Sequence, residues 1–377
     1  MKRHLTIALA ALAAACALGA GAAQAHPAAG IVVDREGRVY FSDLVRVWRV
    51  DARGNLSTFR DGKDLHTHEL FIDEAGNVYG TDSRYDPATE SDSVAVWRMT
   101  PAGEFKYLLA PTADPPRGLG MWRDRAGNTF AWERSDYRKR GAWLVRRSPG
   151  GEVTRLAGSD YGHADGRGEK ASFGITRFTA LGPDGSVYVT DESYVRRVSP
   201  DGTVTTVAAD IRNDRADKPE ERGAPAYLSG IGVDPQGSVY VADFSGGRVI
   251  RIAPDRKTET VFSSERPWTP NGVVWGGGAL YVMEFYSATE RGPFHTRVRK
   301  LSPDGTSTVL ATVRDGAPQP ADSPAAPAAQ PAPKSAAPEG GRTGRVAVPA
   351  FVGAGALALT LVAWRVRRRG SRPGAGG

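Results

Sequence analysis

The feature that most constrains this chain is a unit of apolar strand, tight turn and second strand that recurs six times. Each copy has a turn glycine, an aromatic residue three positions later, an acid three positions after that, and a base further on. The glycines are Gly37, Gly76, Gly127, Gly185, Gly237 and Gly278, and the aromatic residues are Tyr40, Tyr79, Phe130, Tyr188, Tyr240 and Tyr281. The acids are Asp43, Asp82, Glu133, Asp191, Asp243 and Glu284, and the bases are Arg49, Arg98, Arg146, Arg197, Arg251 and Lys300. Such repetition indicates a repeat architecture.

Each unit predicts about four short strands. The first strand is apolar, as in 31–33, and a tight turn with glycine joins it to the second. The segments "RVWRV" (46–50) and "RVIRI" (248–252) alternate with the period of a strand. Four strands in roughly 40–50 residues fit a propeller blade, and closing six blades into a ring covers their faces. We therefore predict an all-β, six-bladed β-propeller at residues 28–313.

The acids and bases that recur in every copy have a structural interpretation. An acid at the end of a second strand can accept hydrogen bonds from the backbone N–H groups of the next turn. A base on the third strand can pair across the sheet. We call the six recurring acids the acid column and the six recurring bases the base column. Because a feature present in all six copies cannot mark one site, we expect both columns to be part of the scaffold.

The segment "LAGSDYGHADGRGEKASFG" (156–174) resembles the connector between blades of NHL-repeat propellers. The segments "DGSVYVTDESYVRRVSPDG" (184–202) and "GSVYVADFSGGRVIRIAPD" (237–255) resemble the blades themselves. The resemblance implies an NHL-type six-bladed propeller. The related gluconolactonase or senescence-marker-protein group shares this fold.

The N-terminus is typical of a secretory signal peptide. Lys2 and Arg3 precede an apolar run, and a small-x-small site follows at 23–25. We predict a signal peptide at 1–25, with an uncleaved anchor as the alternative. The only cysteine, Cys16, lies inside it, so the cleaved chain has neither a disulfide nor a thiolate zinc site.

The C-terminal part predicts a tether. Residues 314–345 are Pro/Ala-rich and indicate a disordered linker. Residues 346–364 contain no charge and are long enough to form one transmembrane helix, and the arginines of 365–377 favour the cytoplasmic side. The sequence thus predicts a single-pass protein of the cell membrane, with the propeller on the extracytoplasmic side. A sorting signal removed after export is the alternative.

The formal net charge of +7 belongs to the two ends of the chain. Lys2 and Arg3 supply two of the positive charges, and the arginines after Trp364 supply five. The predicted propeller and linker are therefore neutral. Since nucleic-acid binding needs a concentrated basic surface, we expect no nucleic-acid partner.

Propellers bind ligands at the mouth of the central channel, where the first strands begin. Counting eight residues back from the turn glycines gives Ala29, His68, Leu119, Arg177 and Ser229. In the sixth copy a one-residue deletion in the turn would place Asn271 there. The predicted ligand-binding residues are His68, Glu69, Arg177, Ser229 and Asn271.

The gluconolactonase group suggests a metal site. The segment "PNGVVWGGGALYVME" (270–284) is similar to the "NGL" blade of that group, whose asparagine binds the divalent metal, so the resemblance implies a metal ligand at Asn271. The group also has acids on two other blades, where this chain has Ala29 and Ser229. Hard cations prefer several oxygen ligands that include carboxylates.

A second metal hypothesis concerns "HTHELF", with His66 and His68 two residues apart and therefore on one face of a strand. Imidazole binds zinc or copper. His163 and His295 could complete a three-histidine set that would look like some NHL-like lyases. The alternative is that these are ordinary polar side chains at a channel mouth. The cofactor prediction is at most one divalent metal, calcium or zinc, held by Asn271, His66 and His68.

Long loops on a rigid ring often carry binding. The chain has such insertions near 83–93, 159–176, 209–227 and 285–295. These observations favour a module that binds or scaffolds a protein, peptide or glycan ligand. The alternative is a metal-dependent gluconolactonase-like hydrolase or lyase with its site at the channel mouth.

Overall fold

The computed structural model describes residues 28–62, 65–86, 91–134, 141–214, 221–287, 294–314 and 317–319. The predicted signal peptide, transmembrane helix and basic tail, and most of the predicted linker, lie outside these residues. Within the part of the chain that the structure describes, no helix is both long and apolar enough to cross a membrane.

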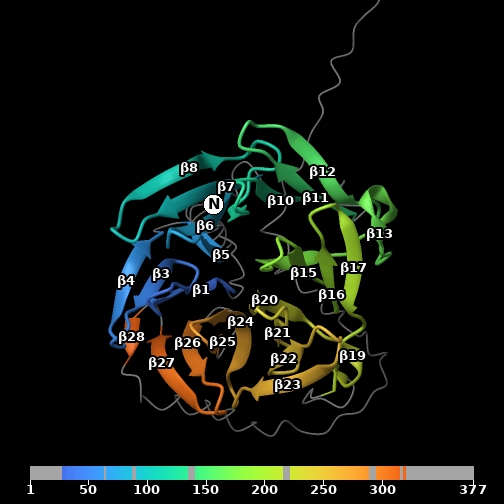
Figure 1. Ribbon diagram of the computed structural model, residues 1–377. Coiled ribbons are helices and arrows are strands. Elements are labelled where there is room, and N and C mark those ends of the chain that lie inside the picture. The colour runs from blue at the N-terminus through green and yellow to red at the C-terminus, as the bar shows by residue number, and fades with distance from the viewer. Residues whose placement is uncertain are drawn as a thin grey trace, which may run out of the picture.

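The described residues form six antiparallel sheets arranged in a ring, together with one two-stranded sheet (Figure 1). Blade 1 contains β1 (Ile31–Val33), β2 (Val39–Ser42), β3 (Arg46–Val50) and β4 (Leu56–Asp61). Blade 2 contains β5 (His66–Ile72), β6 (Val78–Asp86), β7 (Ser91–Met99) and β8 (Phe105–Thr112). Blade 3 contains β9 (Trp122–Arg123), β10 (Thr129–Arg134), β11 (Ala142–Arg147) and β12 (Val153–Gly158).

Blade 4 contains β14 (Thr176–Leu181), β15 (Val187–Asp191), β16 (Tyr194–Val198) and β17 (Thr203–Ala208), with β13 (Gly166–Arg167) at its outer edge and the short 3-10 helix η1 (Gly168–Lys170) after β13. Blade 5 contains β20 (Leu228–Val233), β21 (Val239–Asp243), β22 (Arg248–Ile252) and β23 (Thr258–Ser263). Blade 6 contains β24 (Thr269–Gly276), β25 (Ala279–Ser287), β26 (Phe294–Leu301), β27 (Ser307–Arg314) and β28 (Ala317–Gln319). The pair β18 (Arg212–Asn213) and β19 (Ala224–Pro225) precedes blade 5.

The chain is a six-bladed β-propeller, as the repeat predicts. Each blade is built from consecutive strands. Buried apolar side chains form one cluster at each of the six junctions between neighbouring blades. The cluster between blades 6 and 1 joins Trp48 and Val50 to Ala311 and Val313, so it closes the ring. Burial of these paired faces is what makes the closed ring stable.

The recurring columns pack against one another. In every blade the aromatic residue on the second strand lies directly opposite the base on the third strand, as Tyr40 lies opposite Arg49. Tyr40 also donates a hydrogen bond to Asp34 in the preceding turn, at 3.1 Å. The six turn glycines have φ angles between 77° and 84°, where a side chain would be strained. These columns therefore hold the blades in register.

The β structure extends further than predicted. The sequence predicted the end of the propeller at residue 313 and a linker at 314–345. In the structure β27 continues to Arg314, and β28 pairs with it as a fifth strand through Thr312, Val313 and Arg314. The outer edge of blade 6 has unpaired backbone groups, which a following extended segment can satisfy. The composition of this segment carries no strand pattern that would reveal this.

Candidate functional site

The acid of the recurring column on the second strand of blade 2 is a buried structural group. Asp82 is fully buried and accepts two hydrogen bonds from Arg60 of blade 1, at 3.2 and 2.5 Å. Thr67 and the indole of Trp97 also donate to it, at 2.7 and 2.8 Å. A carboxylate with this many donors is held in one position and its charge is neutralised.

The other acids of the column also accept hydrogen bonds or form ion pairs, each with partners in its own blade. Asp43 accepts from the backbone N–H of Arg46 at 2.7 Å, and Asp243 accepts from that of Gly246 at 2.8 Å. The remaining arginine partners are Arg117 for Glu133, Arg196 for Asp191, Arg248 for Asp243, and Arg297 with Arg299 for Glu284. The expectation that the acid column is scaffold is thereby confirmed. We call the side of the ring where these acids and their following turns lie the acid face.

Glu69 is the most unusual titratable group in the predicted ligand-binding set. It lies on β5, and its side chain is almost completely buried. Burial raises the pKa of its carboxyl from 4.5 to about 8, although the backbone N–H of Thr179 on β14 donates to it and lowers the pKa in part. A side chain of blade 2 thus reaches the inner strand of blade 4. This shift favours the protonated form of the Glu69 carboxyl at pH 7.

The two histidines of "HTHELF" lie close together on β5. The strand begins at His66, and a register shift between Thr67 and Glu69 leaves His68 as the extra residue of a bulge. The ring centroids of His66 and His68 are 6.1 Å apart. Burial lowers the pKa of His66, and the charge of Asp82 opposes this shift.

Asn271 takes part in closing the ring. It is buried, and its side-chain nitrogen donates a hydrogen bond to the backbone carbonyl of Ala28 in blade 1. Only its amide oxygen is then left as a metal ligand. Ser229 is buried and donates to the carbonyl of Ala242 at 3.3 Å, and position 29 is an alanine. This set of donors does not fit a hard divalent cation, which needs carboxylate oxygens.

The other two histidines lie in separate clusters. His163 stacks on Tyr194 with a centroid distance of 4.1 Å and lies 3.2 Å from Glu192. His295 stacks on Tyr286 at 5.2 Å. Across the described ranges no group of three or more His, Cys, Asp or Glu side chains is arranged to hold a metal. The metal role of His66, His68 and Asn271 stays a prediction.

The long insertions share the acid face. The hairpins β6–β7 and β25–β26 extend several residues past the acids of the column. The β18–β19 pair leads into the first strand of blade 5. Exposed tyrosines accompany them. Tyr85 extends from β6, Tyr161 follows β12, and Tyr227 precedes β20, with exposed fractions of 55%, 46% and 37%. Arg177, a predicted ligand-binding residue, lies over the ring of Tyr227 at 4.4 Å.

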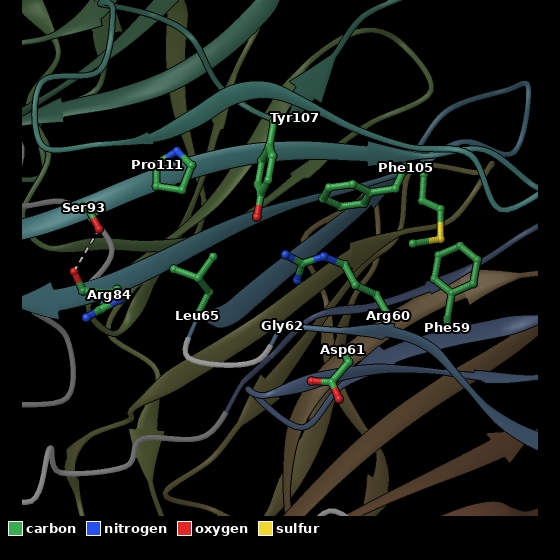
Figure 2. A pocket seen from close by; sticks show the side chains of 11 residues that line it. Phe59, Arg60, Asp61, Gly62, Leu65, Arg84, Ser93, Phe105, Tyr107 and Pro111 are labelled. Carbon is green, nitrogen blue, oxygen red and sulfur yellow. Dashed lines mark hydrogen bonds between the residues drawn. The ribbon is translucent and has the colours of Figure 1, made fainter.

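A groove of about 620 Å³ lies between blades 1 and 2. In Figure 2, Tyr107 and Phe105 extend from β8 toward Arg60 and Leu65, whereas Arg84 and Ser93 lie toward the other end. The rings of Phe105 and Tyr107 meet edge to face at 4.9 Å. Phe105 and Tyr107 are 42% and 36% exposed, so apolar surface is open to solvent here.

Sequence reasoning missed Tyr161, Tyr227 and the groove. Tyr161 could have been found from the sequence, because it lies among glycines and aspartates in the connector 158–165, which is typical of an exposed loop. Aromatic residues on an outer fourth strand, which usually carries polar side chains outward, are the signal for Phe105 and Tyr107. The groove itself depends on how two blades meet, and no single repeat contains it.

No family model matches the chain. A stretch of 92 residues, 24% of the chain, is 35% identical to teneurin-4 of Homo sapiens, and a stretch of 91 residues is 37% identical to teneurin-3 of Mus musculus. The matched stretches span about 3% of the length of these curated relatives. The similarity is local.

Solved structures with a similar arrangement include virginiamycin B lyase from Staphylococcus aureus, with 16% identity, a TM-score of 0.42, and 74% of this chain and 82% of that one covered. A gluconolactonase from Xanthomonas campestris has 17% identity, a TM-score of 0.43, and coverage of 69% and 83%. A chain of a nidogen/laminin complex has 14% identity, a TM-score of 0.45, and coverage of 72% and 91%. The assignment to a six-bladed propeller rests on the sheet topology of this chain itself.

Proposed function

We propose that this chain is an exported, membrane-anchored β-propeller that binds a protein, peptide or glycan ligand outside the cytoplasm through its acid face. The segments at 1–25 and 346–364 support export and anchoring. Most acids of this face are engaged in hydrogen bonds and ion pairs within their own blades, and Asp82 is bonded to Arg60 of the neighbouring blade. The insertions and exposed side chains of this face are what remain for recognition.

The observation that carries the proposal is the exposure of Tyr85, Tyr161 and Tyr227 on one face. Tyrosine is enriched at recognition surfaces because it offers a large apolar ring and a polar hydroxyl with few rotatable bonds. Two of these rings are held in place. The hydroxyl of Tyr161 donates to Glu192 at 3.0 Å, and Arg177 covers the ring of Tyr227. Side chains that are already ordered lose less entropy when a ligand binds.

The alternative, a metal-dependent gluconolactonase-like hydrolase or lyase, has less support because the donors around Asn271 do not fit a hard cation. Glu69 is the observation that favours an enzyme. A carboxyl that stays protonated at neutral pH can act as a general acid. Its side chain is only 7% exposed, which restricts the approach of a substrate.

The test is a binding screen of the full-length protein in detergent micelles against an array of glycans and a library of synthetic envelope-protein peptides. The variant carries Tyr85→Ser, Tyr161→Ser and Tyr227→Ser. We expect at least one probe to bind the wild-type protein and the variant to bind it at least about tenfold more weakly, as for the loss of interface anchors.

The matched control replaces three exposed residues in turns of the opposite face, Arg53→Ser, Glu104→Ser and Gln236→Ser. It should bind like the wild-type protein. If no probe binds, or if the tyrosine variant keeps the wild-type affinity, the proposal is wrong.

A further inference from the structure

The groove between blades 1 and 2 is a second exposed aromatic surface, and none of the three tyrosines of the acid face lines it. Phe59 on the outer strand of blade 1 packs on the apolar cluster between the blades, and Met99 belongs to that cluster. The groove continues this cluster outward to Phe105 and Tyr107 on the outer strand of blade 2. The proposed ligand site does not use it.

Its chemistry suits a proline-rich peptide. Segments in the polyproline II conformation dock into grooves lined by aromatic rings, because their conformation costs little entropy and proline rings pack on aromatic faces. Phe105 and Tyr107 meet edge to face and leave ring surface exposed. The hydroxyl of Tyr107 can donate to a peptide carbonyl, since carbonyls in this conformation have no internal partner.

The chain itself supplies such a segment at the right place. β28 is the outermost strand of blade 6, and blade 6 packs on blade 1. The sequence after Gln319 contains prolines at 320, 324, 327, 331, 333 and 338. Pro324 and Pro327 are three residues apart, so they share one face of a polyproline II helix.

The reach is sufficient. At about 3.1 Å per residue, the extended segment spans about 16 Å from Gln319 to Pro324 and about 60 Å from Gln319 to Pro338. Packed sheets lie about 10 Å apart, and blades splay outward from their cores. Only blade 1 separates the outer edge of blade 6 from the groove, so a few tens of Å are enough.

We propose that the proline-rich segment after Gln319 docks into the groove between blades 1 and 2 of its own chain, with prolines of 324–338 that come within reach packed against Phe105 and Tyr107. The inference does not depend on the ligand of the acid face. Docking would fix how the propeller is oriented on its tether.

The test is photo-crosslinking of the full-length protein in detergent micelles. The variant Tyr107→p-benzoylphenylalanine is irradiated, the monomer band is digested, and the cross-linked peptides are identified by mass spectrometry. We expect cross-links from position 107 to residues 320–338 within one chain. Replacing the prolines at 324, 327, 331 and 333 together by glycine should remove most of this cross-link.

The matched control places the same photoreactive residue at Tyr161, an exposed tyrosine outside the groove. It should give no cross-link to 320–338. The proposal is overturned if position 107 cross-links a second copy and gives a dimer, if it cross-links only other segments, or if both positions label 320–338 equally.

Discussion

Burial should decide how much each arginine of the acid column contributes to stability. Arg60 and Arg117 each make two hydrogen bonds to an acid at the same position of the repeat, Asp82 and Glu133 respectively. The side chains of Arg60 and Asp82 are 6% and 0% exposed, whereas those of Arg117 and Glu133 are 54% and 21% exposed. The two pairs therefore differ mainly in solvent access.

Arg60→Met should lower the free energy of unfolding by about 3–5 kcal/mol, because it leaves the charge of Asp82 buried with only neutral donors. The lost contact between the guanidinium and the ring of Trp97, at 4.7 Å, adds to this. Arg117→Met should cost about 0–1 kcal/mol, since water screens an exposed pair and can solvate Glu133.

Urea unfolding of the full-length variants at pH 7, followed by tryptophan fluorescence, measures both values. Adding Asp82→Asn to Arg60→Met should recover part of the loss, because the double variant no longer buries an unpaired charge. High salt should weaken the contribution of Arg117 and leave that of Arg60 almost unchanged. Equal losses for the two single variants would refute this reasoning.

Three further predictions concern single positions. The pKa of Glu69 is raised from 4.5 to about 8 on folding, so its contribution to stability is fully present below pH 4.5 and is lost as the pH rises through 8. Glu69→Gln should remove up to about 5 kcal/mol of this pH dependence in unfolding experiments. Asn271→Ala should cost about 1–3 kcal/mol, because the carbonyl of Ala28 loses its donor. Gly80→Ala should cost at least about 1–3 kcal/mol in thermal unfolding, because its Cβ would lie 2.3 Å from the ring of Trp97.

Each of these predictions has its own contradicting result. Parallel pH profiles for the wild-type protein and Glu69→Gln would show that the carboxyl is solvated. Unchanged stability of Asn271→Ala would mean that the amide does not help to close the ring. For Gly80→Ala the control is Gly150→Ala, where the φ angle is unstrained and the nearest atom to a Cβ is the Ser148 hydroxyl oxygen at 3.8 Å. If the two alanine variants lose equal stability, the contact with Trp97 is not the cause.

The ring of blades could be predicted because every repeat carries the same strand and turn pattern. The turn glycines need positive φ angles, the strands alternate, and the closing faces are apolar, so local signals and the global fold agree. Asp82 shows the limit of this reasoning. Its position in the repeat indicated a scaffold role, but its partner Arg60 comes from the neighbouring blade, and pairing between blades has no fixed spacing in the sequence.

The site was predicted less completely, for geometric reasons. Counting back from the turn glycines found His68 and, with a one-residue deletion, Asn271, but it could not tell that Asn271 donates to the backbone of the first blade. The bulge at His68 could not be predicted by counting alternating positions, because it adds one residue to the strand. The groove at Tyr107 is formed by residues of two blades. The exposure of Tyr227 depends on how the preceding insertion folds. These features are set by packing between distant segments.

The metal content of the full-length protein tests the central claim most directly, because it separates a binding module from a metal-dependent enzyme. The purified protein is dialysed against zinc and calcium, washed, and measured by inductively coupled plasma mass spectrometry beside the variant Asn271→Ala. We expect substoichiometric metal in both proteins, since Ala29 and Ser229 supply no carboxylate. One zinc or calcium ion per chain, lost in Asn271→Ala, would contradict the account and favour the enzyme.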